Sequence, residues 1–263
     1  LRLDEHEQVL PVLAHDGLDL PTGLRLARRS DQLDWWVEVG DRVLVGGGRV
    51  CLPRATVLAV RTRRPQRVGP VVGADSRRGL GVLEALVPAG GDLPGQAADV
   101  VRAALADDHE GVLEAVTGLV GRGPGLTPSG DDALCGVMLT LRAFRCGHAH
   151  RVVAEQVRAL THRTTSLSAS LLLAAADGYA VPDVVRLTSV LAAASALPEC
   201  VTTDWQDPPD RPVGARSGGS CQSVVPEALA HVQAIGHSSG CDVIAGVHGT
   251  LLALAEARGA CRD

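Results

Sequence analysis

Apolar residues recur at helical spacing over most of the chain after about residue 76, and this periodicity constrains the fold more than any other feature. The pattern runs through residues 76–87, 95–108, 111–120, 131–147, 150–163, 166–179, 181–197, 225–236 and 241–259. Aromatic residues make up only 2% of the chain, so Leu, Val and Ala must fill the core, a composition that suits packed helices. We therefore predict a mainly α-helical domain of eight or nine helices over residues 73–263.

The first 72 residues have a different pattern. Short runs rich in Val, Leu and Trp, separated by Gly, Pro and Asp, cover residues 8–14, 23–29, 34–40, 42–52 and 55–64. Because no helical pattern separates these runs, they predict a small antiparallel β sheet or barrel over residues 1–72. The expected fold class is α+β, with this β domain followed by the helical domain.

One segment of the helical domain fits neither pattern. Residues 199–224 are rich in Pro, Gly, Ser and Asp, and a stretch of this length and composition predicts a flexible insertion or a mobile flap.

Composition narrows the classes of function. The net charge is −5 and no basic tract occurs, so nucleic acid is not an expected partner. No apolar run is long and uninterrupted enough to predict a membrane span. Seven scattered cysteines without a C-x-x-C pair predict neither a zinc ribbon nor a disulfide framework. We expect a cytoplasmic protein that needs no cofactor.

A phrase of unusual composition occurs twice. The first motif, "GRGPGLTPSGDDALCG", spans Gly121–Gly136, and the second motif, "GHSSGCDVIAG", spans Gly236–Gly246. With an offset of 110 residues, "SGDDALCGVMLTL" and "SGCDVIAGVHGTL" agree at seven of thirteen positions. An internal duplication explains this agreement, and so do similar packing demands on two helices.

The physics of the two motifs supports two interpretations. Thr127 or Ser129 can cap a helix, and acidic residues in a first turn favour the helix dipole. In one interpretation the motifs are capped, glycine-notched helices that cross tightly in the core. In the other, their loops present N–H groups and hydroxyls at two helix N-termini, which together bind a small anion. The sequence leaves both open.

Three segments together carry a family resemblance. The first motif, a central segment "THRTTSLSASLLLAAADG" from Thr161 to Gly178, and the second motif resemble, in this order, a bacterial family typified by the AllH subunit of oxamate carbamoyltransferase. The central segment departs from the family pattern, because "TTSLSAS" stands where related chains often show an Asn-Pro-like step. The resemblance implies transfer of a carbamoyl group between a ureido donor such as oxalurate and phosphate, with partner subunits taking part.

We expect the two motifs to meet at one pocket, with Arg163 or residues 164–168 as a third wall. The candidate catalytic residues are Asp131, Asp132, His237 and Asp242, of which His237 serves either as an acid or base or as a structural hydrogen-bonding group. The candidate substrate-binding residues are glycines, hydroxyl residues and two arginines able to bind anions bidentately: Arg122, Gly123, Gly125, Thr127, Ser129, Gly130, Arg163, Thr164, Thr165, Ser166, Ser238, Ser239 and Gly240. No metal site is expected, because the acids and histidines match no standard ligand spacing.

The leading hypothesis is a carbamoyltransferase-like enzyme, or a subunit of one. It would bind a small ureido or carbamoyl substrate and phosphate at the two glycine-rich helix N-termini. The alternatives are a non-catalytic anion-binding or scaffolding subunit of a larger complex, and a metal-assisted amide hydrolase. Partner subunits are expected from the resemblance, and self-association into a homo-oligomer stays open.

Overall fold

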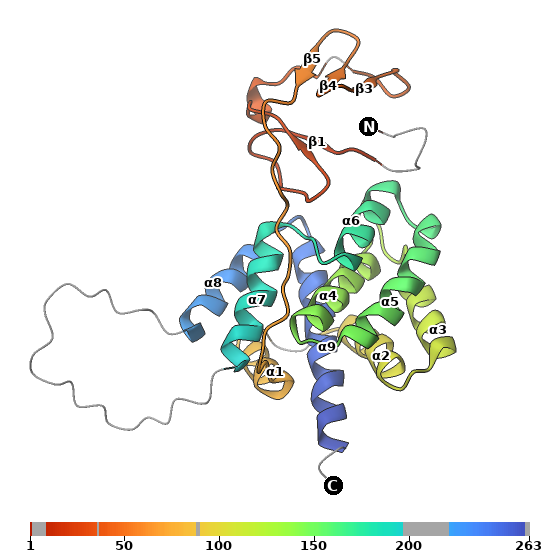
Figure 1. Cartoon of the computed structure of the whole chain (residues 1–263), viewed down its shortest axis with the longest axis vertical. Coiled ribbons are helices and arrows are strands. Elements are labelled where there is room, and N and C mark those ends of the chain that lie inside the picture. The colour runs from red at the N-terminus through yellow and green to blue at the C-terminus, as the bar shows by residue number, and fades with distance from the viewer. Residues whose placement is uncertain (2–8, 36, 88–89, 197–220, 261–263) are drawn as a thin grey trace, which may run out of the picture.

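The computed structural model describes residues 1, 9–35, 37–87, 90–196 and 221–260, which form a small β part and a larger helical part (Figure 1). β1 (Val12–Leu13) pairs with β2 (Leu24–Arg25) in parallel, and the short 3-10 helix η1 (Ser30–Gln32) follows. β3 (Leu44–Gly46), β4 (Arg49–Cys51) and β5 (Thr56–Leu58) form a separate antiparallel sheet. The predicted α+β class is confirmed. The predicted single antiparallel sheet is wrong in detail, because the β residues are divided between two small sheets, β1 and β2 pair in parallel, and the described residues of the run 34–40 form no strand.

Nine α-helices fall within the described ranges, which confirms the predicted helical domain. They are α1 (Ser76–Glu84), α2 (Leu93–Leu105), α3 (His109–Leu119), α4 (Ser129–Ala143), α5 (Gly147–Leu160), α6 (Ser166–Ala176), α7 (Pro182–Ala196), α8 (Cys221–Gln233) and α9 (Ser239–Ala260). A 3-10 turn, η2 (Thr161–Arg163), connects α5 to α6. Of the predicted insertion, residues 199–220 lie outside the described residues, and residues 221–224 belong to the start of α8.

An extended segment leads from β5 along the helices to α1 (Figure 1). Val68 is fully buried, and its N–H donates to the carbonyl of Gly178 at 2.8 Å. The N–H of Val71 donates to the carbonyl of Ala143 at 2.9 Å, and Arg142 Nε donates to the carbonyl of Val68 at 2.6 Å. The segment before the predicted boundary at residue 72 therefore packs against the helical part and is hydrogen-bonded to it.

Helices α4 and α9 make the most extensive helix–helix contact of the fold. A Cβ atom at Gly136 would overlap the carbonyl oxygen of Val243, and one at Gly246 would overlap the carbonyl oxygen of Ala133. These four residues occupy equivalent positions under the 110-residue offset. The two motifs thus cross as a nearly symmetrical pair, and their glycines permit the close backbone approach.

The core of the helical part surrounds this crossing. Leu134, Met138, Leu139 and Leu141 of α4 are fully buried, as is Leu251 of α9. By length and composition alone, residues 239–257 of α9 would suffice to cross a membrane, and 61% of that stretch is buried among the other helices. This burial is what a central helix of a packed bundle shows.

Candidate functional site

The structure brings the two motifs and the central segment together at the N-terminal ends of α4, α6 and α9. The hydroxyls of Thr127 and Ser239 share a hydrogen bond of 2.9 Å, although 112 positions separate them along the chain. Thr165 Oγ1 donates to the carbonyl of Leu126 at 2.5 Å and also accepts from Ser168 N, which caps α6. Each segment therefore contacts another through side-chain hydroxyls.

Asp131 is a fully buried carboxylate whose oxygens are occupied by protein donors. Oδ1 accepts from the N–H of Gly121 at 2.8 Å. Oδ2 accepts from Ser168 Oγ at 2.6 Å and from Thr164 Oγ1. Through these three hydrogen bonds, Asp131 connects the first motif to the central segment. Both of its oxygens already accept hydrogen bonds from protein donors.

The glycine at position 121 is part of the same connection. Its φ of +75° lies in the left-handed region, and a Cβ atom there would lie 2.5 Å from the carbonyl oxygen of Arg163. A larger residue would both strain the backbone and push the first motif away from η2.

Asp132, the next residue, is placed very differently. It is 7% exposed, and within the part of the chain that the structure describes its Oδ2 atom is buried without a hydrogen-bond partner. A buried carboxyl oxygen without a donor is costly when it carries charge, so it favours the protonated acid.

Burial accordingly raises the pKa of Asp132 from 3.8 to about 7. The negative charges of Asp242 and Asp131 act in the same direction. Hydrogen bonding from the hydroxyls of Ser239 and Thr127 lowers the pKa of the same carboxyl and offsets part of the rise. Near neutral pH, Asp132 can therefore donate or accept a proton.

Asp242, which the 110-residue offset pairs with Asp132, is half-buried in the first turn of α9. Its Oδ2 atom also lacks a hydrogen-bond partner among the described residues. Its charge acts on Asp132, which makes the two carboxyls an electrostatically coupled pair.

A cavity of about 250 Å³ adjoins Asp132. Thr127, Asp132, Cys135 and Ser239 are among its polar lining residues, and burial raises the pKa of the Cys135 thiol well above its ordinary value. Aliphatic side chains form most of the remaining wall: Leu18, Leu20, Leu139, Leu167, Leu171, Val181, Val184, Ile235 and Val243. The lining contains no arginine or histidine.

Sequence reasoning missed this apolar wall. Leu18 and Leu20 precede β2 in the β part, and nothing in their local sequence connects them to the motifs. Leu167 and Leu171 fall within the central segment, four positions apart on α6, and this spacing was a readable signal for a shared helix face.

The backbone donors expected to bind an anion are partly occupied. The N–H of Gly130 donates to the carbonyl of Arg122 at 2.9 Å, and that of Gly240 donates to the carbonyl of Ile235 at 3.1 Å. The N-cap of α4 is Pro128, with no side-chain cap, so neither Thr127 nor Ser129 makes the predicted capping hydrogen bond. In each motif, a backbone N–H in the first turn of the helix is therefore already hydrogen-bonded to a carbonyl of the preceding loop or helix end.

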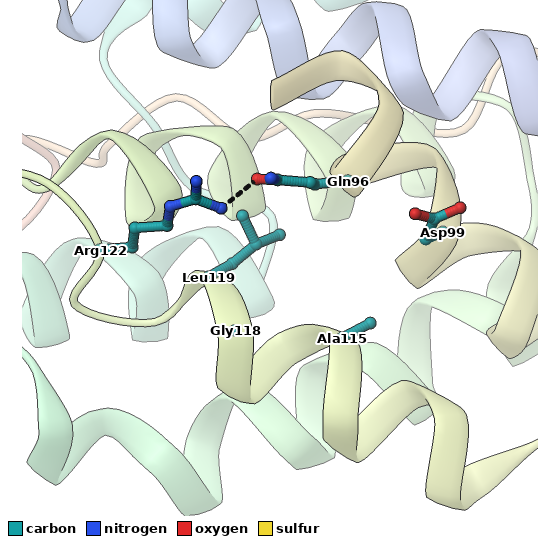
Figure 2. Close-up of a pocket in the computed structure, with 6 residues that line it drawn as sticks. All are labelled: Gln96, Asp99, Ala115, Gly118, Leu119 and Arg122. Atoms are coloured by element: carbon teal, nitrogen blue, oxygen red, sulfur yellow. Dashed lines mark hydrogen bonds between the residues drawn. The ribbon is translucent and has the colours of Figure 1, made fainter. Parts of the chain in front are cut away.

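Neither predicted arginine lines the cavity. Arg122 lies in a different, shallow pocket beside α2 and α3, where its Nη1 donates to Gln96 Oε1 at 2.6 Å (Figure 2). Arg163 is exposed on η2, and the structure records no hydrogen bond or ion pair for its guanidinium among the described residues.

The other predicted site residues are half-buried or exposed. Ser129 is half-buried at the start of α4, close to Gly123, whose Cβ would lie 2.8 Å from the N atom of Ser129. The remainder are exposed on the loops or at a helix start, namely Gly123, Gly125, Ser166, His237 and Ser238. Across residues 9–35, 37–87, 90–196 and 221–260, no group of three or more His, Cys, Asp or Glu is arranged to hold a metal ion.

This geometry defines a helical protein with a cavity at the junction of two glycine-rich motifs, walled mostly by aliphatic groups and bearing one carboxyl of raised pKa. Residues 119–205 match the family described as oxamate carbamoyltransferase subunit AllH. The match confirms the predicted resemblance over this segment, which contains Asp131, Asp132 and the central segment. Searches of curated proteins and of solved structures found no match.

Proposed function

We propose that this chain is a carbamoyltransferase-like enzyme, or a subunit of one, that binds the ureido or carbamoyl end of a small substrate beside Asp132. The family match supports the class of protein. The observation that carries the proposal is the position of Asp132, which lines the cavity where the two motifs meet and whose buried Oδ2 atom lacks a partner among the described residues.

A ureido group is chemically suited to this carboxyl. It presents one carbonyl acceptor and several N–H donors, and a carboxyl near its pKa supplies a donor in one protonation state and acceptors in both. The hydroxyls of Thr127 and Ser239 lie beside the carboxyl and offer further donors or acceptors. A neutral head group also avoids the repulsion that Asp132 and Asp242 would exert on an anion.

In the proposed transfer, an oxygen of hydrogen phosphate forms a bond to the carbamoyl carbon while the bond from that carbon to the donor nitrogen breaks. Asp132 gives its proton to the departing nitrogen, and the proton of hydrogen phosphate restores the acid. The products are an amine or amide and carbamoyl phosphate. Asp242 acts through its charge, which adds to the rise that burial gives the pKa of Asp132.

The phosphate is proposed to approach from outside the cavity, because no basic residue lines the wall. The exposed part of the first motif, from Gly123 to Leu126, is one side of this approach. Arg163 adjoins the same loop through its backbone contact with Gly121, and an exposed guanidinium there suits a phosphate dianion.

The test is formation of carbamoyl phosphate from phosphate and a panel of ureido donors, from oxalurate to N-alkylureas. The chain is assayed alone and after co-expression with the products of its neighbouring genes. Asp132→Asn should lower turnover by about 10²–10⁴-fold, as expected for loss of a general acid. Asp99→Asn, at an exposed acid on α2, is the matched control and should leave turnover unchanged.

Wild-type turnover in Asp132→Asn would contradict the proposed role of this carboxyl. Binding of a ureido donor without turnover under any condition would instead favour the non-catalytic subunit. Binding without turnover would be compatible with the structure, because hydroxyls and one carboxyl in a cavity are sufficient to bind a ureido group.

A further inference from the structure

The cavity beside Asp132 is more apolar than the donor oxalurate would require. Away from the helix N-termini, its wall includes Leu18 and Leu20 from the β part, Leu167 and Leu171 from α6, and Val184 from α7. Leu20 and Leu171 are partly buried, and Leu18 is 40% exposed. These side chains come from segments far apart in the sequence and present aliphatic surface to one space.

The charges around this space disfavour an ionised ligand inside it. Asp132 is the one carboxyl in the lining, and no arginine or histidine accompanies it. Moving a ligand carboxylate from water to an aliphatic wall without a cation is strongly unfavourable. An aliphatic group in the same place gains free energy with each methylene that leaves water.

The volume limits the size of the ligand. An aliphatic cavity of about 150 Å³ accommodates benzene, so the cavity of about 250 Å³ holds roughly ten non-hydrogen atoms. A ureido head takes four of these, which leaves room for an aliphatic group of about four to six carbons.

We infer that the ligand of this cavity is a small molecule with a neutral ureido or amide head and an aliphatic group of about four to six carbons. The head lies at Asp132, Thr127 and Ser239, and the aliphatic group lies against Leu20, Leu167 and Leu171. This inference rests on the proposed function, because that function places the ureido head at Asp132.

The first test is calorimetric titration of the full chain with methylurea, ethylurea, butylurea and hexylurea. Each methylene should strengthen binding about fourfold until the cavity is filled, so butylurea, with three more methylenes, should bind roughly sixty times more tightly than methylurea. Oxalurate should bind more weakly than butylurea. A series that is flat with chain length, an absence of binding throughout, or tighter binding of oxalurate would each overturn the inference.

Variants separate the two ends of the ligand. Leu18→Gln and Leu20→Gln should weaken butylurea binding about fivefold or more and leave methylurea binding unchanged. Asp132→Asn should weaken every member of the series by the same factor and keep the dependence on chain length. Leu58→Gln, at a 63% exposed residue of β5 outside the lining, is the matched control and should bind like the wild type.

Circular dichroism establishes that each variant is folded. Unchanged butylurea binding in both folded leucine variants would show that the aliphatic group binds elsewhere and would overturn the inference.

The inference and the proposed function fail in different ways. If alkylureas bind with the expected dependence on chain length and none yields carbamoyl phosphate, the ligand class is supported and the transferase chemistry is contradicted. If oxalurate is turned over at a rate that falls in Asp132→Asn, while the alkylurea series is flat, the transferase is supported and the ligand class is contradicted.

Discussion

Replacing Asp132 with asparagine should change how the stability of the protein depends on pH. The carboxyl is 7% exposed, and burial raises its pKa to about 7. Asparagine has nearly the same shape and does not titrate in this range. Any fixed cost of the buried amide is equal at every pH, so the comparison isolates the ionisation of Asp132.

The sign follows from proton binding. Between pH 3.8 and about 7 the folded protein holds the Asp132 proton more tightly than the unfolded chain does, so wild-type stability falls as the pH rises through this window. The full difference corresponds to about 4 kcal/mol, at about 1.36 kcal/mol per pKa unit. Over the range from pH 5 to pH 8 it amounts to about 2.5 kcal/mol.

The assay is urea-induced unfolding of the wild type and Asp132→Asn at pH 5 and at pH 8. The stability of the variant relative to the wild type should rise by about 2.5 kcal/mol between the two pH values. Asp99→Asn, which removes an exposed ion pair with Arg102, should show a change of less than about 0.5 kcal/mol. A relative stability of Asp132→Asn that is constant with pH, or that falls at pH 8, would refute the reasoning.

Further substitutions test the packing and hydrogen bonding around the cavity. Gly136→Ala should destabilise the protein by about 2–3 kcal/mol in urea, because its methyl group overlaps a carbonyl of α9. Gly118→Ala meets open space on α3 and should be neutral or stabilising, so equal effects would argue against the tight crossing. Asp131→Asn should lower the free energy of unfolding by about 2–3 kcal/mol, because it removes a charged acceptor from three donors. A loss below about 0.5 kcal/mol would contradict the role of Asp131 in connecting the first motif to the central segment. Thr127→Val and Ser239→Ala should show a coupling energy of about 1 kcal/mol in a double-mutant cycle, whereas additive effects would contradict their hydrogen bond.

Local patterns predicted much of this fold. Helical periodicity predicted the eight or nine helices of which nine are described, and the runs rich in Val and Leu predicted the β part, although the run at 34–40 forms no strand among its described residues. A close helix crossing was one of two interpretations that the sequence left open for the paired glycines, and the α4–α9 crossing shows it at Gly136 and Gly246. The parallel pairing of β1 with β2 was not predictable in this way, because each strand has only two residues.

The sequence could not distinguish the two adjacent acids of the first motif. Asp131 and Asp132 have the same chemistry, and their different roles depend on partners far along the chain. Thr164 and Ser168 occupy the oxygens of Asp131, whereas Asp132 faces the cavity. The direction of the Arg122 side chain depends in the same way on Gln96 of α2.

The central claim is that the cavity at the junction of the two motifs holds a ureido group against Asp132. A crystal structure of the full chain with butylurea tests it most directly. The account predicts the ureido group within hydrogen-bond distance of the Asp132 carboxyl, with the butyl group against Leu167 and Leu171. Butylurea bound at another site, or a cavity filled by the protein's own side chains, would contradict it.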